Sequence, residues 1–257
     1  MSDVLHFWNK QAEQFGADSE ATTPDRHYHD YEISRIMRVL REGERVVDVG
    51  CGSGYATLKY AAAFPRSKFI GIDYSVPMIE AGRAAAREAK ITNVDFIHGD
   101  VLTLDDLYVA EPDTVLSTRC LINLANWDEQ EHALGQMSDM MKNGRLILVE
   151  NTLEGLASLN ILRSAMGLHA ITQRHHNHYL PGERLRDALA DLFDTQAWIN
   201  IGSLYYLISR VVYASLAKRD GVEPRYDHPL NEIARALATL DIDIGDYSPN
   251  YMIVCER

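Results

Sequence analysis

The residues whose types and spacing most clearly suggest chemistry lie at positions 46–54, which read Val-Val-Asp-Val-Gly-Cys-Gly-Ser-Gly. Gly50, Gly52 and Gly54 stand at every second position, and Asp48 precedes them. Glycine allows the backbone to adopt positive φ and to approach a ligand closely. The loop therefore predicts close contact between the backbone and a ligand, with a tight turn that binds nothing as the alternative.

The spacing of the glycines in this loop differs from that of two common nucleotide-binding loops. Dinucleotide-binding loops read Gly-x-Gly-x-x-Gly, and phosphate-binding P-loops continue with Lys-Ser/Thr, whereas here Tyr55 and Ala56 follow Gly-x-Gly-x-Gly. Two more acids end the next two apolar runs, Asp73 and Asp100. A carboxylate at the first position can accept both hydroxyls of a ribose, and one at the second can accept a hydrogen bond from an adenine amino group. The set predicts a nucleoside at three consecutive strand ends.

Three motifs together, Val-Val-Asp-Val-Gly-Cys-Gly-Ser-Gly-Tyr, Gly-Ile-Asp-Tyr-Ser-Val-Pro-Met-Ile and Ile-His-Gly-Asp-Val-Leu, resemble those of class I S-adenosylmethionine-dependent methyltransferases. The resemblance covers residues 44–150 well and the last strand loosely. It implies that the glycine loop lies against the methionine part of S-adenosylmethionine and that Asp73 holds the ribose. It also implies that Met78 packs on the adenine, although plain helix packing is the alternative. The expected cofactor-binding residues are Trp8, Asp48, Gly50, Cys51, Gly52, Gly54, Asp73, Tyr74, Met78, Asp100, Val101 and Arg119.

The chemistry implied by this resemblance is methyl transfer from a sulfonium, which leaves S-adenosyl-L-homocysteine as product. Because the methyl group is already activated, the protein mainly aligns the acceptor and excludes water. A hydroxyl acceptor needs a base, whereas an amine must only enter in its neutral form. We expect transfer to an oxygen, with nitrogen as the less favoured alternative, of a small polar metabolite, neutral or anionic, or of a sugar or natural-product intermediate. Two alternatives are a non-catalytic cofactor-binding partner of a methyltransferase and an NAD-dependent oxidoreductase.

The loop after the fourth expected strand reads Ser-Thr-Arg-Cys-Leu-Ile-Asn-Leu-Ala-Asn-Trp. It lacks the Asn/Asp-Pro-Pro-Tyr motif, which argues against methylation of DNA amino groups. Arg119 can bind an anionic substrate group or the cofactor carboxylate in a bidentate manner, or it forms an ion pair within the protein. Asn123 orients the substrate or caps the next helix. The Leu-Ile-Asn-Leu-Ala-Asn-Trp stretch is similar to bacterial small-molecule methyltransferases of antibiotic or surface-glycan pathways.

Four of the ten histidines lie within residues 169–178. Histidine titrates near neutral pH, acts as a base and binds metals. One interpretation is a base or substrate contact above the transferred methyl group, provided by His176. A second is a metal site built from His175 and His178, placed at i and i+3 of a helix, with His29; no carboxylate or cysteine stands near in sequence. The third is a solvated polar loop. We favour the first and expect no metal.

Further candidates flank the expected cofactor site on both sides. Trp8 and Phe15 either close over the cofactor or are buried against the sheet. Tyr206 and Arg210 share a helix face at i and i+4, either lining the pocket or packing in an amphipathic helix. The expected catalytic residues are His29 and His176, and the expected substrate-binding residues are Arg26, Tyr28, Arg119, Asn123, His175, His178, Tyr179, Tyr206 and Arg210.

The elements that must position these residues alternate between strand and helix in steps of roughly 25 residues, which is typical of βαβ units. We predict an α/β, doubly wound, Rossmann-like sheet of seven mostly parallel strands, forming one domain over residues 1–257. Its parts are an N-terminal helical cap (1–42), a cofactor-binding core (43–151), a helical insertion or lid after the fifth strand (152–192) and a C-terminal part (193–257). The expected strands are 45–49, 68–72, 94–98, 114–117, 145–150, 194–201 and 251–255.

The composition limits the partners and the setting. The net charge of −12 disfavours phosphate backbones and anionic lipid, so we expect a small-molecule substrate, no nucleic acid and no membrane. Three widely spaced cysteines predict neither a disulfide framework nor a zinc site. No signal peptide or apolar run of membrane-spanning length is apparent. The simplest expectation is a cytoplasmic enzyme, and a homodimer is left open.

Overall fold

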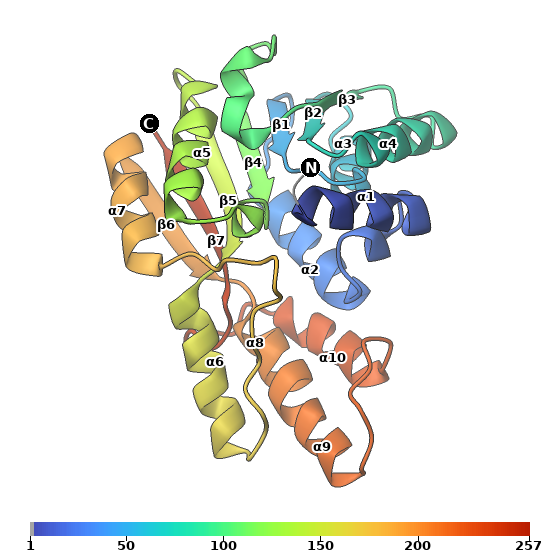
Figure 1. Cartoon of the computed structure of the whole chain (residues 1–257), viewed down its shortest axis with the longest axis vertical. Helices are drawn as coiled ribbons and strands as arrows, with labels where there is room; N and C mark the ends of the chain where they lie inside the picture. The colour runs from blue at the N-terminus through green and yellow to red at the C-terminus, as the bar shows by residue number, and fades with distance from the viewer. Residues whose placement is uncertain (1–2) are drawn as a thin grey trace.

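The computed structural model describes residues 3–257 and is built on a seven-stranded sheet of order β3-β2-β1-β4-β5-β7-β6 (Figure 1). β7 runs antiparallel to both of its neighbours, and the other neighbouring pairs are parallel. This confirms the predicted doubly wound, mostly parallel fold. Residues 1 and 2 of the predicted cap lie outside the described residues. The strands are β1 (Arg45–Val49), β2 (Lys68–Asp73), β3 (Val94–His98), β4 (Thr114–Thr118), β5 (Arg145–Asn151), β6 (Thr195–Asn200) and β7 (Asn250–Glu256).

Helices cover both faces of the sheet, because its central strands are apolar on both sides, as buried parallel strands are. In β1, Val47 and Val49 pack in the core that includes α5 and α7, whereas Val46 packs in the core that includes α2, α3 and α4. The helices of these layers are α2 (Arg26–Met37), α3 (Tyr55–Ala63), α4 (Val76–Glu88), α5 (Trp127–Asp139) and α7 (Gly182–Leu192).

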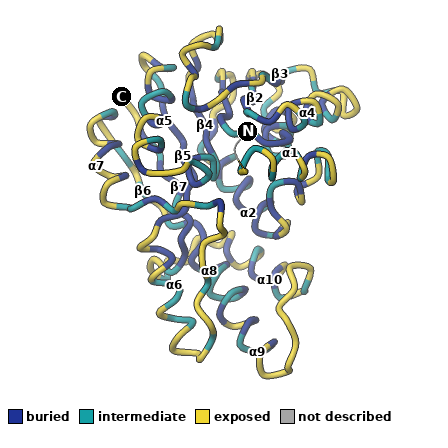
Figure 2. The backbone as a smooth tube through the Cα atoms, in the orientation of Figure 1, coloured by how far each residue is buried: buried dark blue, intermediate teal, exposed yellow. Residues whose placement is uncertain are grey.

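A further group of helices lies beyond the carboxyl ends of the parallel strands. Figure 1 shows α6 beside α8, α9 and α10 below the sheet, with α1 in front of α2. In Figure 2 the tips of these lower helices are mostly exposed, whereas the central strands of the sheet are buried. The helical cap and the helical insertion after β5 therefore both lie at the edge of the sheet where the parallel strands end. The elements are α1 (Asp3–Phe15), η1 (Ser19–Ala21), η2 (Val101–Asp106), η3 (Leu121–Asn123), α6 (Leu153–Ala165), α8 (Ser203–Tyr206), η4 (Leu207–Val212), α9 (Tyr213–Arg219) and α10 (Pro229–Ala238).

The insertion differs from the prediction in its histidine-rich part. α6 ends at Ala165, and Gly167 follows with φ of 66°, a left-handed conformation that glycine adopts without a steric cost. Asn160 then holds the returning chain, because its amide group exchanges hydrogen bonds of 3.0 and 2.8 Å with the backbone of Ile171. Residues 167–181 form a loop along α6, so the prediction that His175 and His178 share a helix face is wrong.

The helix predicted over residues 204–218 also has an internal irregularity. Its central part, η4, is π-helical and joins α8 to α9 without a break. A π-helical turn is rare and is often found at functional sites. Within residues 3–257, no helix is both long and apolar enough to cross a membrane.

Candidate active site

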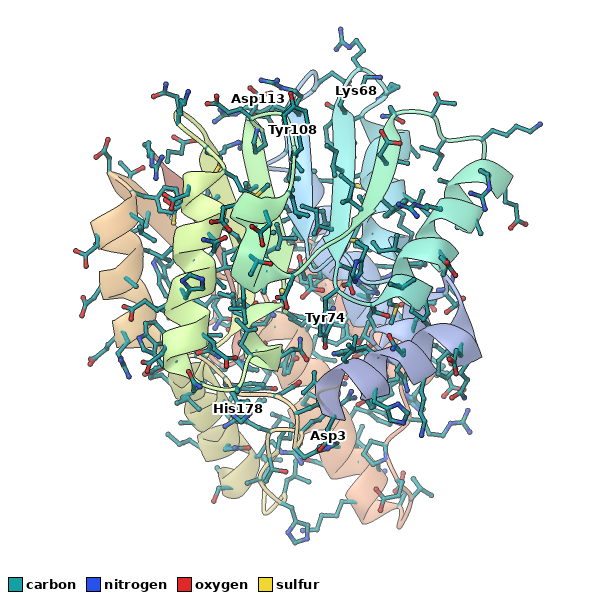
Figure 3. All side chains as sticks on the ribbon, turned by 45° about the horizontal axis from the view of Figure 1, so that its top comes forward. Asp3, Lys68, Tyr74, Tyr108, Asp113 and His178 are labelled. Carbon is teal, nitrogen blue, oxygen red and sulfur yellow. The ribbon has the colours of Figure 1, made fainter. Side chains whose placement is uncertain are left out.

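A cavity of about 950 Å³ opens at the carboxyl ends of the parallel strands. Its walls come from α1, α2, the strand ends, the 167–181 loop and η4. Figure 3 places Tyr74 and His178 toward this end of the sheet and Lys68 and Asp113 at the opposite end. The predicted site residues all line the cavity except Gly54 and Arg26.

The two exceptions have clear structural surroundings. Gly54 precedes α3 with φ of 75°, and a Cβ there would lie 2.4 Å from the ring of Phe96, so this glycine serves close packing of the loop on β3. The side chain of Arg26 is exposed and lies 4.0 Å from Asp18. The structure therefore does not bring Arg26 to the predicted site.

The first two glycines of the loop form one wall of the cavity. Gly50 and Gly52 have φ of 75° and 55°, a region that disfavours side chains. A Cβ on Gly50 would lie 2.6 Å from Cys120, and one on Gly52 would lie 2.8 Å from Thr22. Gly50 and Cys51 donate backbone hydrogen bonds of 2.8 and 3.0 Å to the carbonyl of Ile72. The loop is thus held against β2, and at Gly50 and Gly52 no side chain separates the backbone from the cavity.

Asp73 ties this loop to the end of β2. One carboxylate oxygen accepts from the Gly52 amide and the other from the Ser75 amide, both at 2.9 Å. Burial raises the pKa of Asp73 to about 6, against the lowering effect of these two hydrogen bonds. A carboxylate has about four lone-pair sites, so both oxygens keep the capacity to accept from a ligand in the cavity.

The remaining predicted cofactor residues surround this point. Asp48 accepts a 2.5 Å hydrogen bond from Thr57 Oγ1, and burial raises its pKa to about 6. Asp100 accepts from the Leu102 amide at 3.0 Å and caps η2. Met78 packs with Trp8 and other residues of α1 and η1, so it both lines the cavity and holds α1 on α4. Cys51, Tyr74 and Val101 also line the cavity.

Arg119 lies in an ion pair rather than free in the cavity. Its Nη2 is 2.9 Å from Glu32, a fully buried carboxylate of α2, which the sequence analysis missed. Arg119 has φ of 51°, and Asn123 braces this strained turn by donating to the Arg119 carbonyl at 2.7 Å. The alternative that Asn123 caps the next helix is wrong, because Asn126 caps α5 by accepting from the Glu129 amide.

Glu150 is a second buried acid that the sequence analysis missed. It is the residue before the last of β5 and accepts from the Leu121 amide at 2.7 Å. Burial raises its pKa to about 8, although this hydrogen bond and the charge of Arg119 oppose the rise. Glu150 is therefore largely protonated at neutral pH, and the Glu32–Arg119 pair beside it is close to neutral as a unit.

The two histidines predicted to be catalytic have different environments. The Nδ1 atom of His29 is 2.8 Å from Ser19 Oγ, and burial, reinforced by the charge of Arg119, lowers its pKa to about 3. His176 is also buried, its ring centroid lies 4.4 Å from that of Phe7, and its Nδ1 has no hydrogen-bond partner. Burial, followed by the charges of His175 and Arg174, lowers the pKa of His176. Both imidazoles are neutral at pH 7.

The other histidines of the loop do not form a metal centre with His29. His175 and His178 are exposed and line the mouth of the cavity. No group of three or more histidine, cysteine or acidic side chains between residues 3 and 257 is placed to hold a metal ion.

The tyrosines and Arg210 line the side of the cavity away from the glycine loop. Arg210 forms an ion pair with Asp25, and its guanidinium lies 5.4 Å from the Tyr206 ring centroid. Asp25 also accepts from the Tyr28 amide as the N-cap of α2; the sequence analysis missed this role, although aspartate before a helix is a recognisable N-cap signal. Tyr28 donates to Asn250 Oδ1 at 2.7 Å. Tyr179 also lines the cavity, and its amide donates to Gln173.

Several buried polar atoms of cavity-lining residues have no partner. Among them are Tyr74 Oη, Asn123 Oδ1, Arg119 Nε, His176 Nδ1 and Ser53 Oγ. Buried polar atoms are nearly always hydrogen-bonded in folded proteins. Together with the bare glycine backbone and the acids at the strand ends, these atoms fit a polar ligand of nucleoside type, such as S-adenosylmethionine, better than an empty core.

Comparison with known proteins agrees with this geometry. Residues 40–179 match a family model described as a methyltransferase domain. The chain is 25% identical over 144 residues to (S)-coclaurine N-methyltransferase of Papaver somniferum, which covers 55% of this chain and 39% of the relative. It is 29% identical over 114 residues to ribosomal RNA small subunit methyltransferase G of Chlorobium limicola, covering 44% and 50%. The chain thus spans about half or less of the length of these curated relatives.

Among solved structures, magnesium protoporphyrin IX methyltransferase from Synechocystis PCC 6803 with bound S-adenosylhomocysteine shares the fold. The TM-score is 0.56 at 19% identity, over 77% of this chain and 88% of that one. The family match covers more than half of the chain and shows the family, and the shared fold agrees with it. The protein belongs to the class I methyltransferase family and uses S-adenosylmethionine as its cofactor.

Proposed function

We propose that the protein transfers a methyl group to an oxygen atom of a small polar, anionic metabolite. The observation that carries this proposal is that one cavity is lined both by the glycine loop and by His176, whose buried Nδ1 has no hydrogen-bond partner. The size of the cavity, about 950 Å³, lies at the upper end for small-molecule sites. It leaves room for an acceptor beside the cofactor.

The cofactor end is assigned on the donors and acceptors present there. The Asp73 carboxylate accepts the ribose hydroxyls, and Asp100 with Val101 lines the adenine edge. The backbone at Gly50 and Gly52 lies against the methionine part, while Met78 and Trp8 supply apolar contacts. The unpartnered Nε of Arg119 would donate to the carboxylate of the cofactor's methionine part. Glu32 keeps the Arg119 guanidinium in place.

The protein's own contribution to the reaction is alignment and proton removal. S-adenosylmethionine, when bound, supplies an activated methyl group. His176 accepts the proton of the acceptor hydroxyl at Nδ1, because its lowered pKa keeps the imidazole neutral at pH 7. The contact of His176 with Phe7 closes the loop onto α1 and excludes water. His29 is too weak a base at a pKa of about 3, so we assign it the positioning of α2 through Ser19.

Two other acceptors are raised by the relatives, and a third outcome is that the protein transfers no methyl group. A nitrogen acceptor is supported by the relative named as an N-methyltransferase. The relative named as a ribosomal RNA methyltransferase raises an RNA acceptor, which the net charge of −12 disfavours. A non-catalytic cofactor-binding partner would keep the glycine loop and need no acceptor chamber.

The test has two stages. Calorimetry with S-adenosylhomocysteine and with NAD should give saturable binding of the first and none of the second. A methyl-labelled donor is then offered with matched acceptors, 4-hydroxybenzoate, 4-aminobenzoate, a hydroxylated sugar acid and a ribosomal RNA oligonucleotide. Label on a hydroxyl compound supports the proposal, label only on the amine or the RNA replaces it, and product binding without any transfer favours the non-catalytic partner.

A further inference from the structure

The part of the cavity farthest from the glycine loop, here called the acceptor chamber, has an apolar lining between two helical segments. α6 contributes Leu156 and Leu159, and the returning loop contributes Ile171. Opposite them stand the rings of Tyr206, Tyr213 and Tyr226, from α8, α9 and the segment before α10. Walls of this kind favour a flat or aliphatic body over a strongly hydrated sugar.

Charge is divided between the two ends of the cavity. The acids Asp48, Asp73 and Asp100 line the cofactor end. Of the other acids that line the cavity, Glu32 pairs with Arg119 and Asp25 pairs with Arg210, whereas Asp3 and Glu129 line it without an ion-pair partner among the described residues 3–257. The arginines that also line the acceptor chamber are Arg163, Arg174, Arg210 and Arg225.

Within residues 3–257, Arg163 and Arg174 are the two cations of this group without an ion-pair partner, and the less exposed of them is Arg163. It is half-buried, its Nε donates to the His169 carbonyl at 2.9 Å, and its Nη1 donates to the Arg210 carbonyl. No carboxylate between residues 3 and 257 forms an ion pair with it or with the exposed Arg174. A partly buried cation without an opposite charge is costly, and the second arginine nearby adds to this cost. An anion in the chamber would remove it.

The backbone that presents Arg210 is itself unusual. Arg210 belongs to the π-helical η4, as does the buried Ser209, whose hydroxyl contacts both Arg210 and Asn231. Asp25 fixes the Arg210 guanidinium from the opposite side. The carbonyl of Arg210 in turn receives Arg163, so the two arginines are held together by a frame that spans three segments of the chain.

We propose that the acceptor carries an oxyanion, carboxylate or phosphate, on an apolar body, and that Arg163 binds the oxyanion while Leu159, Ile171 and the tyrosines enclose the body. This inference rests on the proposed function, since it names the acceptor class of the same site. It adds a specificity-determining residue, Arg163, that the cofactor chemistry does not require.

The test uses four probes with one body and different head groups, 2-naphthoate, 2-naphthyl phosphate, 2-naphthamide and 2-naphthylmethylamine. Each is titrated by calorimetry into the full chain saturated with S-adenosylhomocysteine. One of the two anions should bind at least about tenfold more tightly than the amide, as expected for a charge-assisted contact, and the amine should bind least. The stronger of the two anions identifies the carboxylate or the phosphate as the natural head group.

Three variants test whether the Arg163 side chain causes the tighter binding of the anion over the amide. Arg163→Met should remove the advantage of the anion over the amide, and Arg163→Lys should restore part of it. Arg184→Met removes the same charge outside the cavity, where Arg184 lies over the Trp127 ring, and should change nothing. Retained affinity for S-adenosylhomocysteine shows that each variant is folded.

Three results would overturn the inference: equal binding of acid and amide, tighter binding of the amine, or no saturable binding of either anion. An unchanged anion preference in both Arg163 variants would do the same. If S-adenosylhomocysteine itself does not bind the unmodified chain, the proposed function fails instead, and the two failures are distinguished by that first titration.

Discussion

The two ends of the cavity are built in opposite ways. The cofactor end consists of bare backbone and acids drawn from one stretch, Asp48 to Val101, at the ends of three neighbouring strands. The acceptor end consists of side chains from distant parts of the chain, because Asp25 pairs with Arg210 and Tyr28 bonds to Asn250, 222 residues away. The first end depends on local turn geometry, and the second depends on how four helical segments pack.

This difference between the two ends indicates which positions of the cavity tolerate amino-acid substitution. The glycine loop has little freedom, since a Cβ at Gly50 would collide with Cys120. The acceptor end is framed by ion pairs and ring contacts that other side chains of similar size could replace without disturbing the sheet. Methyltransferases that share one cofactor can therefore differ in their acceptors, and variants at the two ends should affect different measurements.

The largest expected effect separates turnover from cofactor binding at His176. Replacing His176 with phenylalanine keeps a ring against Phe7 but removes the base, so kcat should fall by about 10²–10⁴ while the affinity for S-adenosylhomocysteine changes little. His175→Phe, at the exposed neighbour, is the control. In the unmodified protein the acid limb of the kcat profile should lie below the ordinary histidine value near 6.5, because burial lowers the pKa of His176. Full activity in His176→Phe would show that another group accepts the proton.

The contrast between the two ends also decides how much of the site is visible in the sequence. The loop, Asp73 and Asp100 are recognisable because residue type and strand end coincide locally. Glu32, Asp25 and Arg163 were missed because their roles come from partners far along the chain, and no periodicity reports an ion pair. The sequence predicts a helix where the 167–181 loop lies, because nothing in this polar, histidine-rich stretch marks Gly167 as a turn. The hydrogen bonds between Asn160 and Ile171 that hold the loop are equally invisible in the sequence.

The second largest effect is the loss of folding free energy at acidic pH that we expect from His29. This residue lies between the two ends of the cavity, where it packs beside Tyr55. The folded-state pKa of about 3 lies below the unfolded value near 6.5, so the contribution is fully present above pH 6.5 and is lost as the pH falls. The loss is roughly 1.4 kcal/mol per pH unit, or about 2–3 kcal/mol between pH 6.5 and 4.5. Urea unfolding of His29→Gln should lack this loss, whereas exposed His6→Gln should retain it. Identical pH slopes in all three proteins would mean that His29 is protonated in the folded state.

A third change acts on the cofactor end alone. Asp73→Ala removes the acceptor for the Gly52 and Ser75 amides and for a ribose, so S-adenosylhomocysteine should bind more weakly by about 1–3 kcal/mol. Asp73→Asn, which keeps one acceptor oxygen, should lose less. Calorimetry with 2-naphthoate should give the same affinity in both variants if the two ends are independent. A parallel loss of naphthoate binding would show that the ends are coupled through the loop.

The smallest effect tests the boundary between the ends, at Glu150. A carboxyl whose folded pKa is raised to about 8 supports folding below its unfolded value near 4.3 and loses that support as the pH rises toward 8. Glu150→Gln has no charge to bury and keeps an oxygen for the Leu121 amide. Its new amide nitrogen faces Arg119, which offsets much of the gain, so the variant should exceed the unmodified protein by roughly 1 kcal/mol at pH 8. The decisive measurement is the difference in unfolding free energy between variant and parent at pH 6 and at pH 8. This difference must grow with pH if Glu150 is a neutral acid beside a self-neutralised Glu32–Arg119 pair, and it must stay constant if Glu150 is already the charged partner of Arg119 at pH 6.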